Sequence, residues 1–104
     1  TTSVAGGQQV LPAQYALHEN YPNPFNPRTV ISYQLAEHSS VRLAIFNLLG
    51  QRVRTVVERQ QPAGTHTVSW YGMVEARQQV PSGLYFYRLE ANDFNQTRRM
   101  LLLR

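Results

Sequence analysis

Hydrophobic and polar residues alternate along most of this chain. A period of two is typical of β-strands that bury one face. The alternating segments are residues 31–35, 41–45, 53–57 and 67–70. Two further segments, 84–89 and 97–103, are rich in apolar and aromatic residues. The 3.6-residue period of a helix is missing between them, so the pattern predicts an all-β protein.

Two of these segments carry specific expectations. In the segment 53–57, Val53 and Val57 are expected on the same strand face as Thr55, which lies between them. Arg52 and Arg54 are expected on the opposite face. Segment 84–89 is apolar on both faces, which predicts a central strand covered on both sides with Phe86 in the core.

Turn-forming residues separate the predicted strands. Gly50 lies in a Leu-Leu-Gly-Gln hairpin turn, where glycine can take a positive φ. Pro62–Gly64 and Pro81–Gly83 each precede a strand, and 92–95 is a polar turn. Strands at this spacing favour an antiparallel sandwich of about seven strands over a βαβ arrangement.

Residues 1–14 are small, polar and glycine-bearing, without periodicity. They predict a linker or disordered lead-in, which leaves 15–104 as the single domain. Because the sequence begins at Thr1 without a methionine, we expect a piece of a longer protein with any export signal upstream. We also expect the final strand to coincide with the chain terminus.

The segment Asn20–Pro27 (NYPNPFNP) is the least ordinary stretch. Its three prolines fix their own φ and push the preceding residues toward extended conformations, which excludes a helix or a central strand. We expect a stiff strap, anchored by Tyr21 and Phe25, whose asparagines bond nearby backbone groups. One interpretation is an edge strap that closes one end of the core, and the other is a preordered recognition segment. Chemistry alone favours the edge strap, and both interpretations stay open.

The charge of the chain raises the question of a polyanionic partner. The sequence contains ten basic residues, all arginine, and six acidic residues, which gives a net charge of +4. Only Arg98 and Arg99 are adjacent, and an RNA-binding motif is missing, so we expect no nucleic acid and a solvated arginine face. An anionic lipopolysaccharide is a secondary candidate, because guanidinium groups suit phosphate and carboxylate.

Catalytic and metal-binding patterns are weak. The single aspartate and the scattered glutamates form no acid–base pair, and the three histidines lack ligand spacing. Ser82 beside Gly83 is typical of a turn before a strand rather than of a nucleophile. There is no cysteine and no glycine-rich phosphate loop. The sequence therefore predicts no enzyme, no cofactor and no metal.

An ordered set of segments resembles a known family. The segments are Leu17–Pro27, Thr29–Leu35, Val41–Val53, Ala63–Gly72 and Pro81–Arg104. Their order and spacing resemble the C-terminal sorting domain of type IX secretion substrates from Bacteroidetes and relatives. More loosely, they resemble the immunoglobulin-like module of flagellar hook-capping proteins. The resemblance implies an immunoglobulin-like antiparallel β-sandwich.

The resemblance to sorting domains also implies a function. Such a domain is a non-catalytic signal that directs secreted cargo through the type IX outer-membrane translocon and on to cell-surface attachment. The implied partners are this translocon and the surface sortase machinery, and the implied location is outside or on the surface of a Gram-negative bacterium, via the periplasm. The alternative is a structural spacer or accessory module of a multidomain secreted hydrolase. The candidate recognition residues are Asn20, Tyr21, Pro22, Asn23, Pro24, Phe25, Asn26, Pro27, Gly50, Ser82, Gly83, Tyr85, Arg98 and Arg99.

The loop 71–79 departs from the family pattern. Tyr71 stands where the family usually has aspartate, Val74 aligns with a further usual aspartate, and Arg77 aligns with a usual glycine. The carboxylates that would contact a cation in the family are therefore missing at these positions, and the loop loses a glycine suited to positive φ.

Overall fold

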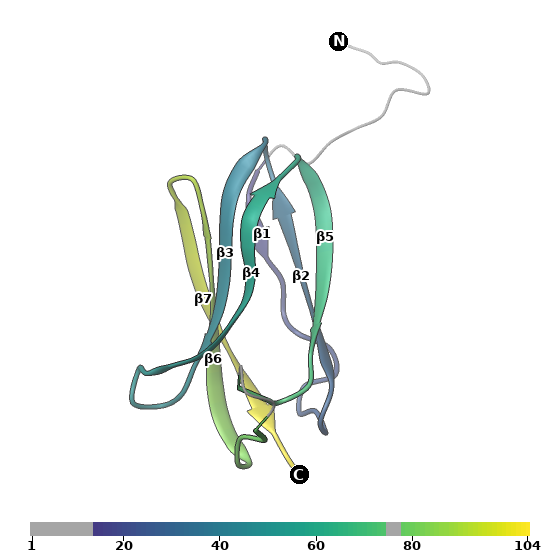
Figure 1. Ribbon diagram of the computed structural model, residues 1–104. Helices are drawn as coiled ribbons and strands as arrows, with labels where there is room; N and C mark the ends of the chain where they lie inside the picture. The colour runs from purple at the N-terminus through teal and green to yellow at the C-terminus, as the bar shows by residue number, and fades with distance from the viewer. Residues whose placement is uncertain (1–13, 75–77) are drawn as a thin grey trace.

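The computed structural model describes residues 14–74 and 78–104, which form seven strands and no helix. The strands are β1 (Ala16–Leu17), β2 (Thr29–Leu35), β3 (Ser39–Phe46), β4 (Arg52–Gln61), β5 (Gly64–Trp70), β6 (Gly83–Ala91) and β7 (Phe94–Leu102). They build two antiparallel sheets, β1-β2-β5 and β4-β3-β6-β7, that stack as a sandwich (Figure 1). The predicted antiparallel sandwich of about seven strands is confirmed. The lead-in expected at 1–14, except its last residue, and Arg77 lie outside the described residues.

The core lies between the two sheets, as the alternating pattern predicts. Strand β2 buries every second residue, and Ile31, Tyr33 and Leu35 are at most 1% exposed. The inward-facing partners on the other sheet are Leu43, Ile45, Tyr87, Leu89, Met100 and Leu102. Each such side chain contributes about 1.5–3 kcal/mol when fully buried.

Strand β6 differs from its prediction. It lies between β3 and β7 and is therefore central in its sheet, but its burial alternates. Tyr85, Tyr87 and Leu89 face the core, whereas Phe86 is half-buried on the outer face. The expectations of cover on both sides and of Phe86 in the core are wrong. The sandwich has two layers, and no third layer covers this face among the described residues.

Strand β4 also departs from simple alternation. Its register with β3 shifts at two places. Thr55 lies opposite Ala44, whereas Val57 lies opposite Leu43, and successive residues on β3 face opposite sides. The expectation of Thr55 on the same strand face as the valines that flank it is therefore wrong for Val57, because an extra residue between them reverses the parity.

The loops divide between the two ends of the sandwich (Figure 1). The turns β2–β3, β4–β5 and β6–β7 lie at one end. The proline strap, the β3–β4 turn, the described part of the β5–β6 connection and the C-terminus lie at the other. Segments that are far apart in the sequence thus share one end of the molecule.

Candidate functional site

The strap Asn20–Pro27 is attached to the free edge of the last strand. Phe25 is 2% exposed, its backbone N–H donates to Leu101 O at 3.0 Å, and its carbonyl accepts from Leu103 N–H at 2.9 Å. The Asn23 side-chain oxygen accepts from Leu101 N–H at 3.0 Å. The predicted anchoring by Phe25 and the predicted asparagine–backbone bonds are confirmed, and the strap protects part of the β7 edge.

Tyr21 does not anchor the strap through its ring. Its backbone N–H and carbonyl pair with Val30 at 3.0 and 2.8 Å, but its side chain is 80% exposed. The expected anchoring by the Tyr21 ring is therefore wrong, because the backbone makes the contact and the ring faces solvent.

A buried polar network fixes the start of the strap. The backbone N–H of Asn20 donates to the Tyr87 hydroxyl at 2.9 Å, and that hydroxyl donates to His18 O at 2.7 Å. The Asn20 side-chain amide donates to Thr29 Oγ1 at 2.9 Å and to Pro22 O at 3.2 Å, and Thr29 Oγ1 donates to Pro22 O at 2.9 Å. A tyrosine of the core strand β6 thus holds the strap in one position.

Replacing Tyr87 by phenylalanine should lower the free energy of unfolding by about 1–3 kcal/mol, because it leaves a buried donor and acceptor without their partner. Chemical denaturation measures the change. The matched control is Tyr71→Phe at a half-exposed ring, which should stay within about 0.5 kcal/mol of the parent. Equal stability of both variants would show that the network contributes nothing.

Buried tyrosines should make the fold sensitive to alkali. Burial raises the pKa of Tyr87 to about 12, and it also raises the pKa of Tyr33 and Tyr85. The unfolded chain ionises its tyrosines near pH 10, so stability holds below about pH 10 and falls as the pH rises toward about 12. With no lysine and no cysteine in the sequence, tyrosine is the side chain that titrates in this window. Urea denaturation across this range should show a decline that is shallower in Tyr87→Phe. A decline of equal slope would contradict this assignment.

Arg98 and Arg99 point to opposite faces of β7. The Arg98 guanidinium donates to Leu17 O at 2.6 Å and ties β7 to β1, whereas Arg99 lies opposite Phe86 on the outer face. The two residues are therefore no single charge cluster, because neighbours on a strand alternate in direction. Both still border a groove of about 430 Å³ that runs from the strap to β6, with Glu19, Asn23 and Thr97.

Two candidate recognition residues near the start of β6, Ser82 and Tyr85, make hydrogen bonds within the domain. Arg104 N–H donates to Ser82 Oγ at 2.8 Å, and its guanidinium donates to Val80 O and Gly72 O at 2.6 Å each. The Tyr85 hydroxyl donates to Pro81 O at 2.6 Å, and its ring is 5% exposed. The Tyr85 ring therefore packs in the core rather than presenting itself to a partner.

The β3–β4 turn lies apart from the strap, because β4 and β7 form opposite edges of the four-stranded sheet. Gly50 adopts φ +81°, as the hairpin prediction requires. Sequence reasoning missed its two neighbours, Leu48 and Leu49, which are 66% and 82% exposed. Two leucines in an otherwise polar turn were the signal that could have found them.

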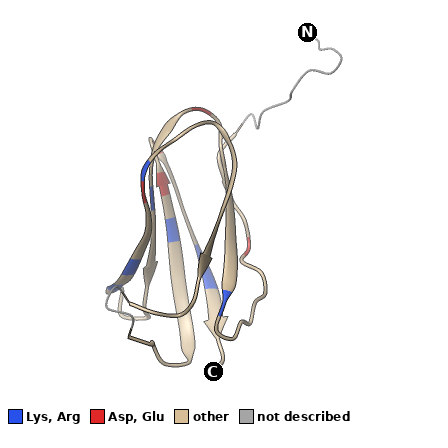
Figure 2. Ribbon diagram, turned by 45° about the vertical axis from the view of Figure 1, so that its right-hand side comes forward, with Lys and Arg blue, Asp and Glu red and all other residues tan. Residues whose placement is uncertain are grey.

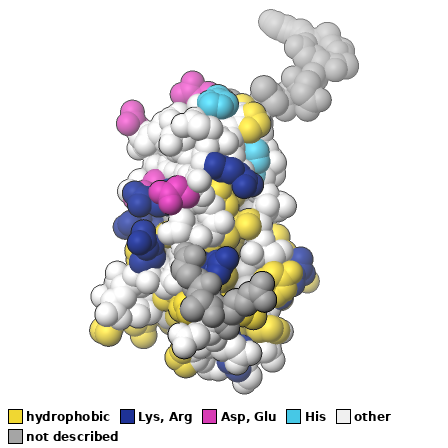
Figure 3. All heavy atoms as spheres, viewed as in Figure 1, with side chains coloured by type: hydrophobic (Ala, Val, Ile, Leu, Met, Phe, Trp, Pro, Cys, Tyr) yellow, Lys and Arg dark blue, Asp and Glu magenta, His cyan; other side chains and the backbone are white. Residues whose placement is uncertain are grey.

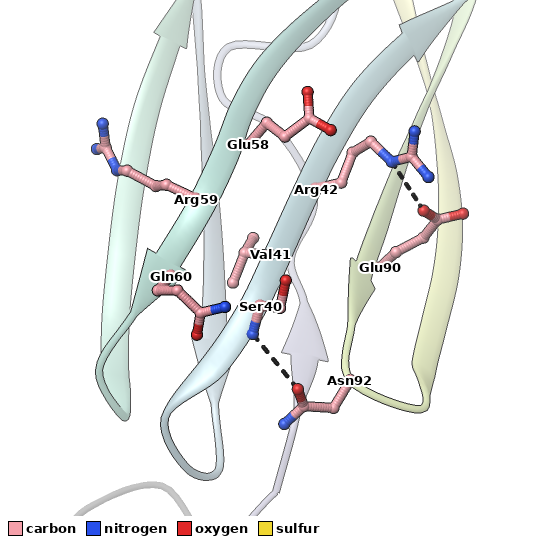
Figure 4. A pocket seen from close by; sticks show the side chains of 8 residues that line it. All are labelled: Ser40, Val41, Arg42, Glu58, Arg59, Gln60, Glu90 and Asn92. Atoms are coloured by element: carbon pink, nitrogen blue, oxygen red, sulfur yellow. Dashed lines mark hydrogen bonds and ion pairs between the residues drawn. The ribbon is translucent and has the colours of Figure 1, made fainter.

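The outer face of the four-stranded sheet carries a further hollow of about 390 Å³ (Figure 4). Arg42 lies between Glu58 and Glu90 and donates to Glu90 at 3.1 Å, and the backbone N–H of Ser40 donates to the Asn92 side chain. These groups form one ion pair and strand contacts rather than a nucleophile with its base.

The described residues hold no group of three or more histidine, aspartate, glutamate or cysteine side chains that could bind a metal ion. They also contain no helix that is long and apolar enough to cross a membrane. The basic residues appear as separate segments on different strands (Figure 2).

Comparison with known families identifies the class. The family model of the FlgD Ig-like domain matches residues 26–94, which is most of the sandwich. The chain therefore belongs to the FlgD Ig-like domain family. Among curated proteins, no sequence matches the chain.

Solved structures share the fold at low identity. PorU of Porphyromonas gingivalis, described as a latent dimer, is 15% identical with a TM-score of 0.70, over 96% of this chain and 10% of PorU. PorZ, described as an essential surface component of the type IX secretion system of the same organism, is 19% identical with a TM-score of 0.58, over 85% and 11% of the two chains. FlgD of P. aeruginosa is 18% identical with a TM-score of 0.57, over 89% and 74%. The chain thus spans about a tenth of PorU and of PorZ.

Proposed function

We propose that this domain is a non-catalytic sorting signal that directs a secreted cargo protein through the type IX outer-membrane translocon to the cell surface. The observation that carries the proposal is the strap. Buried Asn20 and Phe25 hold it in place, while most of its other residues are exposed. A segment that is ordered before binding loses little entropy when a partner takes hold of it.

Other features support the same proposal. Outside the loop 71–79, the ordered motifs of residues 17–104 resemble the sorting pattern, and Asn23, Arg98 and Arg99 line one groove beside the strap. The fold is shared with domains of PorU and PorZ, the second of which is described as a type IX component. The partners in this proposal are the translocon and the surface sortase machinery, with anionic lipopolysaccharide as a further surface ligand for the arginines.

The second candidate is a structural immunoglobulin-like spacer of a multidomain secreted protein. Membership in the FlgD Ig-like family leaves this candidate open, because one fold can host many functions. Tight bonding of the strap also suits a purely structural strap that closes one end of the core.

Export of a reporter tests the proposal. The 104-residue chain, fused to the C-terminus of a periplasmic reporter, should carry it to the surface of a host with a type IX system and leave it in the periplasm when that system is deleted. Tyr21→Ala combined with Asn26→Ala alters only exposed strap residues and should lower the surface amount without lowering thermal stability. Retention of the parent fusion in the periplasm would contradict the proposal.

A further inference from the structure

The β3–β4 turn presents an apolar tip. Leu48 and Leu49 are 66% and 82% exposed, at a place where the chain reverses between two strands. Yellow side chains mark this end of the molecule in Figure 3, where the turn lies in Figure 1. Adjacent leucines at this exposure leave apolar area in water, which marks a contact surface more often than scattered single residues do.

The tip is rigid rather than a free loop. The Asn47 side-chain oxygen accepts from the backbone N–H of Leu49 at 2.9 Å and of Gln51 at 3.0 Å, and its amide donates to Gln51 Oε1 at 2.9 Å. Backbone bonds of 3.0 Å join Asn47 to Gln51 and Gly50. Since the turn is already ordered, the leucines dock without a further ordering cost for the backbone.

The outer sheet face beside the tip is aromatic and cationic. One row crosses all four strands in register, through Arg52, Phe46, Phe86 and Arg99. The Arg88 guanidinium stacks 4.7 Å above the Phe46 ring. A depression of about 250 Å³ beside them is large enough for a carboxylate side chain. It is lined by Arg42, Ala44, Phe46, Gly50, Arg52, Arg88 and Glu90.

The charge of this face is unbalanced. The register places four arginines on it, against two glutamates: Arg42, Arg52, Arg88, Arg99, Glu58 and Glu90. Both ion pairs of the described residues use one carboxylate, Glu90, which lies 3.1 Å from Arg42 and 3.3 Å from Arg88. The face therefore keeps a net positive charge and favours an acidic partner.

We propose that the β3–β4 turn and this outer face form a docking surface for a protein partner. The partner offers an apolar pocket to Leu48 and Leu49, and carboxylates at the pocket rim face Arg52 and Arg88. A protein fits better than a lipid bilayer. Two leucine side chains hold fewer carbons than one myristoyl chain, which alone binds membranes only marginally. The inference rests on the proposed function, because the partner belongs to the export machinery.

Surface display of the fused reporter tests the docking surface. Leu48→Ser with Leu49→Ser, and separately Arg52→Glu, should each lower the surface amount about tenfold or more. Matched controls use exposed residues outside this surface: Tyr71→Ser for the leucines and Arg59→Glu for the arginine, and both should reach the surface like the parent. Thermal melts of the purified chains should agree, which excludes misfolding as the cause.

The outcomes separate the two claims. If the parent fusion stays in the periplasm, the proposed function and this inference both fail. If parent and docking variants reach the surface equally, only the docking surface fails. If the 104-residue chain binds phosphatidylglycerol vesicles and the leucine variant abolishes that binding, the occupant is a lipid surface and the protein partner is wrong.

Discussion

Replacing Trp70 by alanine should lower the free energy of unfolding by about 3–5 kcal/mol. Trp70 is the last residue of β5 and is 2% exposed. Its ring packs against Phe25 and Tyr85, with centroids 5.9 and 5.8 Å apart, and its indole N–H donates to Met73 O at 3.0 Å. Alanine removes these contacts and leaves a cavity that rigid strands cannot fill.

Circular dichroism measures this change, because Trp70 is the only tryptophan and the variant loses the intrinsic fluorescence probe. A loss of this size is a large part of the 5–15 kcal/mol that holds a small domain folded, and it should lower Tm by more than about 10 °C. Tyr71→Ala, at the next and half-exposed position, is the matched control and should change stability little. A near-neutral melt for Trp70→Ala would place that ring at the surface.

Replacing Phe25 by alanine should cost about 3–5 kcal/mol and should also release the strap. The ring is 2% exposed and contacts Trp70, so its loss opens the core at the end where the strap meets β7. Because the two rings touch, the double variant should destabilise by less than the sum of the single variants.

Trp70 fluorescence follows unfolding of Phe25→Ala in urea. Tyr21→Ala is the matched control on the same strap, since that ring is 80% exposed, and it should keep the parent stability within about 0.5 kcal/mol. Equal stability of the two variants would mean that Phe25 does not anchor the strap.

Much of the fold follows from the sequence where local pattern and burial agree. Residues 31–35 alternate strictly, and their strand buries every second residue. Phe25 is correctly predicted as an anchor, because a large apolar ring among polar neighbours has one favourable place. Gly50 is likewise correctly placed, since the hairpin needs positive φ.

The wrong predictions all concern features that the tertiary structure decides. The register shifts between β3 and β4 place Thr55 and Val57 on opposite strand faces, and the local sequence does not indicate such shifts. Phe86 is apolar, but the sandwich has no described layer outside it. The Tyr21 ring is free because its backbone, rather than its side chain, pairs with β2.

The candidate site was predicted in part. The prolines predict the strap. Its hydrogen bonds to Leu101 and Leu103 could not be predicted, because they join segments that are more than 75 residues apart in the sequence. Arg98 and Arg99 were seen as neighbours in sequence, and strand geometry separates their directions. The exposed Leu48 and Leu49 could not be told from core leucines by hydropathy alone.

The position of the domain in a fusion tests the central claim most directly. One reporter carries the 104-residue chain at its C-terminus, and a second carries the same chain followed by another folded domain. In a type IX host, a sorting signal predicts surface display of the first reporter and periplasmic retention of the second. Equal distribution of the two reporters would contradict the sorting account and favour the structural spacer.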